Sequence, residues 1–192
     1  SVELKLSARA KRQDAVVFIV ELVYGGVVQL QDAKREDAEP LNNVIVHTST
    51  TWPHAIRIGG DLNGASDGRV RMVGNTIVFD RPGSATAVYV QLGAGSVEMH
   101  NNAIFQTGGA APAILRENTT ADTPVCAPFV TTPWSGARSV FGTRNWIQST
   151  ATSVPPEWTG TVTGGDAGFR DVAARNFRPL ATSRWSRALT GN

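Results

Sequence analysis

The sequence feature that most constrains the fold is a strand pattern that returns, together with an asparagine, at intervals close to one solenoid coil. The segments NVIV (43–46), NTIV (75–78) and NAIF (102–105) are each followed by a second apolar segment, at 55–58, 87–90 and 113–115. From first to second repeat both elements shift by 32 residues (43 to 75, 55 to 87), and then by 27 and 26. Two elements that move together indicate a repeating structural unit.

A third element precedes the asparagine and shows which side chains point the same way. VRMVGN (70–75) matches VEMHNN (97–102) at a constant shift of 27. Its apolar residues alternate with polar ones, which is typical of a strand that is buried on one face only. In a parallel stack, Arg71 is therefore expected beside Glu98, and Arg57 beside Tyr89.

These repeats predict an all-β fold, a right-handed parallel β-helix of about five to six coils with a C-terminal cap. The coils occupy residues 1–152, with an inserted loop at 117–138, where prolines interrupt the pattern. The pattern resumes with Asn145, which lies 43 residues after Asn102. Residues 153–192 are predicted to form an irregular cap over the last coil.

The repeated asparagines are predicted to be structural. Asn43, Asn75, Asn102 and Asn145 each stand where the chain must turn between strands. Asparagine tolerates the left-handed conformation that such a turn needs. Stacked asparagines also form hydrogen-bonded ladders, which replace backbone pairing lost at the corner.

Composition narrows the possible functions. The 18 basic and 16 acidic residues give a net charge of +2 and form no basic stripe, so nucleic acid is not an expected partner. The chain has no apolar run of about 18 residues, so membrane insertion is not expected either. A single cysteine, Cys126, excludes an internal disulfide and a cysteine-based zinc cluster.

The strand repeats resemble a known superfamily. Residues 68–79 (GRVRMVGNTIVF), 87–90 (AVYV) and 97–105 (VEMHNNAIF) are similar to repeats of right-handed parallel β-helix proteins of the pectate-lyase-like superfamily. Residues 165–171 (GDAGFRD) and 176–180 (NFRPL) resemble the closing segment of bacterial members. The resemblance implies a bacterial protein, secreted or at the cell surface, that binds polysaccharide.

The start of the chain resembles a coil that lies inside longer proteins of that superfamily. The residues that carry this resemblance are VELK (2–5). The resemblance leads us to expect a cover over the open first coil, either an N-terminal portion of the protein or another copy in a homo-oligomer.

The best candidate binding surface is a column of outward side chains on the stacked strands. A polar column with an aromatic ring suits a sugar chain, since arginine pairs with uronate carboxylates and tyrosine stacks on a pyranose. An ordinary solvated sheet face is the alternative. The column consists of Glu3, Gln29, Arg57 and Tyr89, flanked by Lys5, Gln31 and Gln91.

A glycine-rich loop offers the best candidate metal site. Asp61, Asn63 and Asp67 supply three oxygen ligands suitable for Ca²⁺, the one cofactor that the sequence suggests. The segment lacks EF-hand spacing, and a simple turn in which Asp and Asn bind local backbone groups is the alternative.

The sequence does not assign catalytic residues. His47, His54 and His100 are the three histidines, and no partner carboxylate is specified by spacing, so we expect them in turns or on the surface. Overall, the sequence predicts an extracellular carbohydrate-binding domain. If it is an enzyme, a polysaccharide lyase or glycoside hydrolase is expected. The alternative is a non-catalytic structural or adhesive solenoid, such as a surface protein or tailspike segment.

Overall fold

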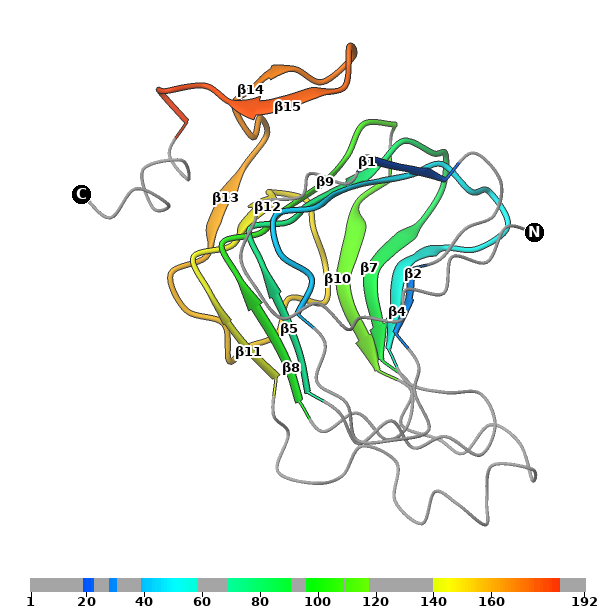
Figure 1. Ribbon diagram of the computed structural model, residues 1–192, viewed down its shortest axis with the longest axis vertical. Coiled ribbons are helices and arrows are strands. Elements are labelled where there is room, and N and C mark those ends of the chain that lie inside the picture. Colours follow the sequence, from blue (N-terminus) through cyan, green and yellow to red (C-terminus); the bar gives the residue numbers. More distant parts are fainter. Residues whose placement is uncertain are drawn as a thin grey trace.

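The computed structural model describes residues 19–22, 28–30, 39–58, 69–90, 96–108, 110–117 and 140–183. Within these ranges every regular element is a β-strand, and no helix long and apolar enough to span a membrane occurs. Three sheets of parallel strands are stacked in register in a solenoid-like arrangement (Figure 1).

The largest sheet has six strands, in the order β1-β3-β6-β9-β12-β13. The chain visits it once per repeat, so strands far apart in sequence become neighbours. Its strands are β1 (Ile19–Leu22), β3 (Val44–His47), β6 (Thr76–Phe79), β9 (Ala103–Gln106), β12 (Trp146–Gln148) and β13 (Val162–Gly164).

Two further parallel sheets are interleaved with it along the chain. The second has the order β10-β7-β4-β2, and the third has the order β11-β8-β5. The second comprises β2 (Val28–Leu30), β4 (His54–Ile58), β7 (Ala85–Val90) and β10 (Pro112–Glu117). The third comprises β5 (Arg69–Val73), β8 (Ser96–His100) and β11 (Val140–Thr143).

The core lies between the three sheets and is built from stacked identical or similar side chains. In the six-stranded sheet, Ile45, Ile77, Ile104 and Ile147 are cross-strand neighbours in successive repeats, and each is at most 3% exposed. Parallel strands in register place equivalent residues about 4.8 Å apart, so each repeat buries the apolar face of the one before it.

The predicted register is largely confirmed. Arg57 pairs with Tyr89 and Arg71 with Glu98, and the 43-residue displacement pairs Val97 with Val140. One predicted shift was wrong, the one between β7 and β10. These strands pair Val88 with Leu115, which is a shift of 27 residues and not the predicted 26. The same 27-residue shift therefore applies to all three sheets between these repeats.

The asparagines form a ladder along the corner between the third and first sheets. Each side-chain amide of Asn43, Asn75 and Asn102 donates to the Oδ1 atom of the next ladder asparagine at 3.0 Å. The backbone N–H of each also donates to that Oδ1 atom, at 2.9–3.0 Å. The ladder satisfies polar groups that would otherwise be buried without partners at the corner.

The sequence predicted that the ladder asparagine adopts the left-handed conformation, and this was wrong. The left-handed residue at this corner is the one before it. Asn42, Gly74, Asn101 and Arg144 have φ angles of 54° to 70°. The turn is made one residue earlier, and the next residue returns to a conformation that directs its amide along the stack. The correct position was obscured because two of the four turns contain consecutive asparagines, at 42–43 and 101–102.

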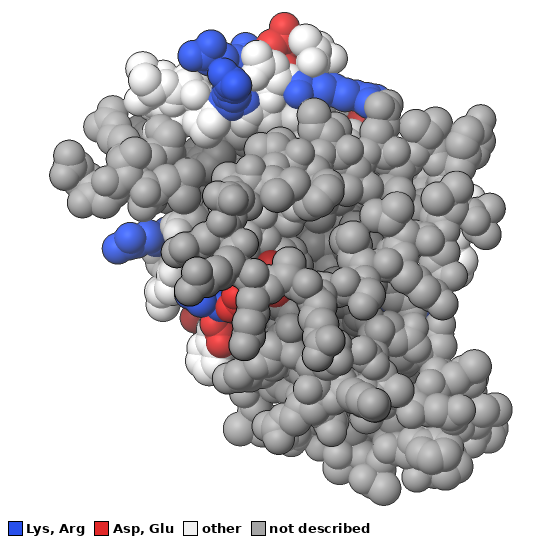
Figure 2. Space-filling view, in the orientation of Figure 1, with Lys and Arg blue, Asp and Glu red and all other residues white. Residues whose placement is uncertain are grey.

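A C-terminal hairpin covers the outward face of the six-stranded sheet. Its antiparallel strands are β14 (Phe169–Asp171) and β15 (Asn176–Pro179). The rings of Phe169 and Phe177 lie 5.5 and 6.4 Å from the ring of Phe105 on β9, in a second apolar cluster. Exposed arginines occupy the other side of the hairpin, and Figure 2 shows basic side chains gathered there at the top of the view.

Candidate functional site

The outward face of the three-stranded sheet carries a mixture of charged and exposed apolar side chains. Inward residues such as Met72 and Met99 are fully buried, so the alternate residues of the same strands point away from the core. We call this surface the ion-pair face. It comprises Glu39, Leu41, Arg71, Glu98, His100, Phe141 and Thr143.

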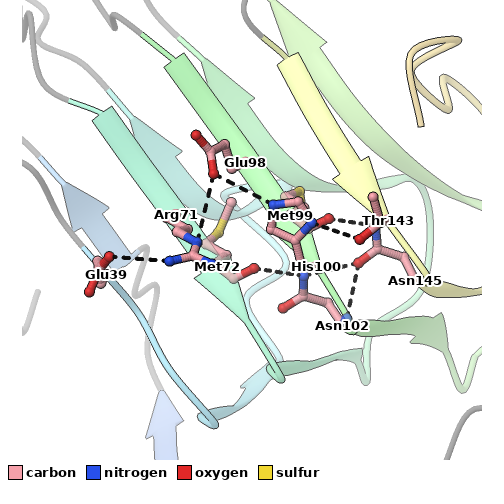
Figure 3. Close-up of polar contacts among 9 residues, drawn as sticks. All are labelled: Glu39, Arg71, Met72, Glu98, Met99, His100, Asn102, Thr143 and Asn145. Atoms are coloured by element: carbon pink, nitrogen blue, oxygen red, sulfur yellow. Dashed lines mark hydrogen bonds and ion pairs between the residues drawn. The ribbon is translucent and has the colours of Figure 1, made fainter. Parts of the chain in front are cut away.

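Glu98 is the centre of the charged part of this face (Figure 3). Its Oε2 atom lies 3.7 Å from Nε of Arg71 and 3.5 Å from Nε2 of His100. Arg71 in turn lies 3.8 Å from Glu39. These groups are partly solvated, so each pair contributes at most about 1 kcal/mol, and the network orients side chains more than it stabilises the fold.

His100 links the carboxylate of Glu98 to the hydroxyl of Thr143. Its Nδ1 atom lies 2.9 Å from Oγ1 of Thr143, on the neighbouring strand (Figure 3). The order hydroxyl, imidazole, carboxylate is the one used by nucleophilic hydrolases. However, the N–H of the next residue, Arg144, already donates to the carbonyl of Thr159, so this donor is not directed at a developing oxyanion. The arrangement is better suited to binding than to acyl transfer.

Two exposed apolar side chains flank the charged centre. Phe141 lies opposite Glu98 on the next strand and is 50% exposed, and Leu41 lies beside Val73 and is 47% exposed. Aromatic residues and arginine are enriched in protein interfaces. This face therefore has the composition of an interaction surface.

Sequence reasoning missed the ion-pair face as a site, although part of its signal was visible. Glu98 and His100 are two residues apart on a predicted strand, and that spacing places both on one face. His100 and Thr143 are related by the 43-residue displacement recognised for the asparagines. Glu39 and Leu41 could not be found in this way, because they precede β3 and join the face through Arg71 and Val73.

The predicted outward column lies partly within the described residues. Gln29, Arg57 and Tyr89 are successive cross-strand neighbours on β2, β4 and β7. The ligand role predicted for them stays a prediction. The other members, Glu3, Lys5, Gln31 and Gln91, lie outside the described residues, as do the candidate Ca²⁺ ligands Asp61, Asn63 and Asp67. Among the described residues, no group of three or more His, Cys, Asp or Glu side chains could hold a metal ion.

The other two histidines lie at the ends of a turn between β3 and β4. His47, expected in a turn or on the surface, is instead 1% exposed, and no hydrogen bond satisfies either ring nitrogen. Arg81 holds the turn by donating to the carbonyls of Trp52 at 2.7 Å and Thr50 at 3.3 Å. Burial and then the charge of Arg81 lower the pKa of His47 to about 4.

The lowered pKa of His47 leads us to expect that the stability of the fold decreases at acidic pH. The pKa of His47 rises from about 4 in the folded chain to its usual 6.5 on unfolding, so the unfolded state binds more protons between these values. Stability is therefore full above pH 6.5 and falls as the pH decreases toward 4, by about 3 kcal/mol for this residue, of which about 2 kcal/mol is lost by pH 5.0. His54, whose pKa is lowered to about 4 chiefly by burial, acts in the same direction.

Urea unfolding at pH 7.5 and 5.0 measures this effect. The His47→Gln variant should lose part of the pH dependence, whereas His100→Gln serves as the control on another sheet. An equal pH dependence in His47→Gln and the unmodified chain would contradict the assignment to His47.

Comparison with known proteins gives one partial similarity. A stretch of 61 residues is 43% identical to the protein-export protein SecB of Caulobacter vibrioides, in both strain NA1000 / CB15N and strain ATCC 19089 / CIP 103742 / CB 15. It covers 32% of this chain and 37% of each relative, so the chain spans little more than a third of their length. No protein-family model matches, and no solved structure matches significantly.

These comparisons correct two predictions. The resemblance to the pectate-lyase-like superfamily is contradicted, because the similarity found is to SecB. The same finding contradicts the predicted carbohydrate-binding function and its structural or adhesive alternative. The misleading signal was the strand repeat itself, which reports how parallel strands stack and carries little information on ancestry or ligand.

Proposed function

We propose that this chain binds polypeptides through the ion-pair face, in a role connected with protein export. The observation that carries the proposal is Phe141, half exposed on a regular strand next to the Arg71, Glu98 and His100 network. A rigid aromatic side chain ringed by oriented polar groups is the usual anchor of a protein interface. The partial similarity to a protein-export protein supports the same class of partner.

The charge of the face defines the partner further. Glu39 and Glu98 oppose one arginine, Arg71, so these three groups sum to −1. A segment with apolar residues and at least one lysine or arginine is complementary to this face, since the apolar residues cover Phe141 and Leu41 and the cation faces the carboxylates.

In this proposal the scaffold is a right-handed parallel β-helix of about five to six coils with a C-terminal cap. Support comes from the parallel in-register strands, because parallel crossovers in one sheet are right-handed in about 98% of cases. Such a scaffold holds the ion-pair face rigid, so binding costs little ordering of the chain. A secreted or cell-surface location and a cover over the first coil stay predictions.

The test is binding of a fluorescently labelled peptide that contains leucine, phenylalanine and two lysines. Phe141→Ser should weaken binding about tenfold, since loss of an aromatic anchor removes roughly 1–2 kcal/mol. Leu41→Ser should have a smaller effect in the same direction. Fluorescence anisotropy provides the dissociation constants.

The matched control is Leu180→Ser, which removes a 41% exposed apolar side chain beyond the C-terminal hairpin. It should leave binding unchanged. Equal affinity of the unmodified chain and Phe141→Ser would refute the proposal, as would no binding by a chain that circular dichroism shows to be folded.

A further inference from the structure

A second surface, on the four-stranded sheet, has the opposite charge. It combines two arginines with two stacked rings. We call it the cationic ledge, and it comprises His54, Arg57, Tyr89 and Arg116, on β4, β7 and β10.

The ledge is ordered by its own ring contacts. The rings of His54 and Tyr89 are stacked, with centroids 4.4 Å apart and planes 16° from parallel. The guanidinium carbon of Arg116 lies 5.6 Å from the Tyr89 centroid, within the range of a cation–π interaction. Tyr89 thus fixes an arginine that is itself exposed to solvent.

The two arginines stand on either side of Tyr89. Arg57 and Arg116 are its cross-strand neighbours on β4 and β10. They are therefore two strand spacings apart, roughly 10 Å between backbones. In a segment with the extended polyproline II conformation, which has three residues per turn and a rise of about 3.1 Å per residue, residues i and i+3 point to the same side and lie about 9 Å apart.

The positive charges of the ledge also act on the neighbouring histidine. After burial, the causes that lower the pKa of His54 are the charges of Arg116, Arg57 and Arg81. Three cations therefore act on one half-buried ring. A positive potential at this place favours an anionic partner.

We propose that the cationic ledge binds the carboxylates of an extended acidic polypeptide segment. Arginine recognises carboxylates through two parallel N–H···O bonds, and the distance between the arginines fits glutamates at i and i+3. The choice of a polypeptide rests on the proposed function, and the ledge extends that function to a second class of segment. A polypeptide that contains acidic and basic-apolar stretches would then engage two different sheets.

The test uses a Gly/Ser peptide with glutamates at i and i+3, titrated into the full chain at low salt. Arg116→Gln should weaken binding about tenfold, and Arg57→Gln by a similar factor, because each removes one charge-assisted contact. Moving the second glutamate to i+1 should also weaken binding. Arg170→Gln, an exposed arginine of the C-terminal hairpin, is the matched control and should change nothing.

Several outcomes would overturn the ledge proposal. One is unchanged affinity of Arg116→Gln for the acidic peptide. Another is a loss in Arg170→Gln as large as that in Arg116→Gln. A third is tighter binding of an oligothymidylate than of the acidic peptide, which would indicate phosphate recognition. Arg57 is partly buried, so the exposed Arg116 decides the result if Arg57→Gln does not fold.

Failure of this proposal is distinguishable from failure of the proposed function. Phe141→Ser should weaken only the basic-apolar peptide, and Arg116→Gln only the acidic one. Binding of the first peptide without the second would retain the ion-pair face and reject the ledge.

Discussion

Replacement of Asn102 by alanine is expected to destabilise the fold by about 4 kcal/mol, since burying unsatisfied polar groups costs about 1–3 kcal/mol each. The side chain is fully buried and makes four hydrogen bonds. Its Oδ1 atom accepts from two groups of Asn75, and its amide donates to the Met72 carbonyl and to Asn145. Alanine replaces none of them, so the loss should disrupt the repeats on both sides.

Urea unfolding followed by circular dichroism measures this change. Asn176→Ala is the control, because Asn176 is exposed on the hairpin and makes one 3.4 Å bond to the Arg178 backbone. It should cost less than about 0.5 kcal/mol. A cost below 1 kcal/mol for Asn102→Ala would mean that the ladder contributes little to stability.

Replacement of Gly142 by alanine is expected to cost about 3 kcal/mol, because overpacking a rigid core displaces a large side chain. A Cβ atom at this position would lie 2.5–2.6 Å from three atoms of the Trp158 indole. Trp158 is 8% exposed and belongs to the main core cluster, so its ring has little room to move.

A double-mutant cycle with Trp158→Leu isolates this contact. The glycine substitution should cost far less once the indole is gone, which would give a coupling energy of about 2 kcal/mol. Gly165→Ala is the matched control, since a Cβ atom there would meet no atom within 4 Å. Equal costs for Gly142→Ala in both backgrounds would show that the indole contact is not responsible.

The sequence predicted the stacking of the strands well, because the repeated asparagine marks each corner. Register failed only between β7 and β10. There, Ile114 and Leu115 are both apolar and both buried, so alternation alone does not distinguish a shift of 26 from one of 27. The structure resolves this ambiguity through backbone pairing.

The candidate sites were less predictable than the strands. Residues on regular strands, such as Arg57 with Tyr89, could be paired by counting. The burial of His47 could not be predicted by counting, because its neighbours belong to the next repeat. The ring of Phe79 and the charge of Arg81 lie near His47 only once the repeats are stacked. The ligand class also could not be read from the strand repeat, because stacked strands tolerate many different outward side chains.

Between these two repeats the shift is 27 residues in all three sheets, so residues 75–101 form one complete repeat unit that could be duplicated. The segment begins at one ladder asparagine and ends immediately before the next, and it contributes one strand to each sheet. A tandem duplication of this segment would present the same donors and acceptors at both new junctions. It would lengthen the stack by about 4.8 Å. It would also add a second copy of Glu98 and His100 to the ion-pair face and of Tyr89 to the cationic ledge, so both surfaces would lengthen together from a single genetic event.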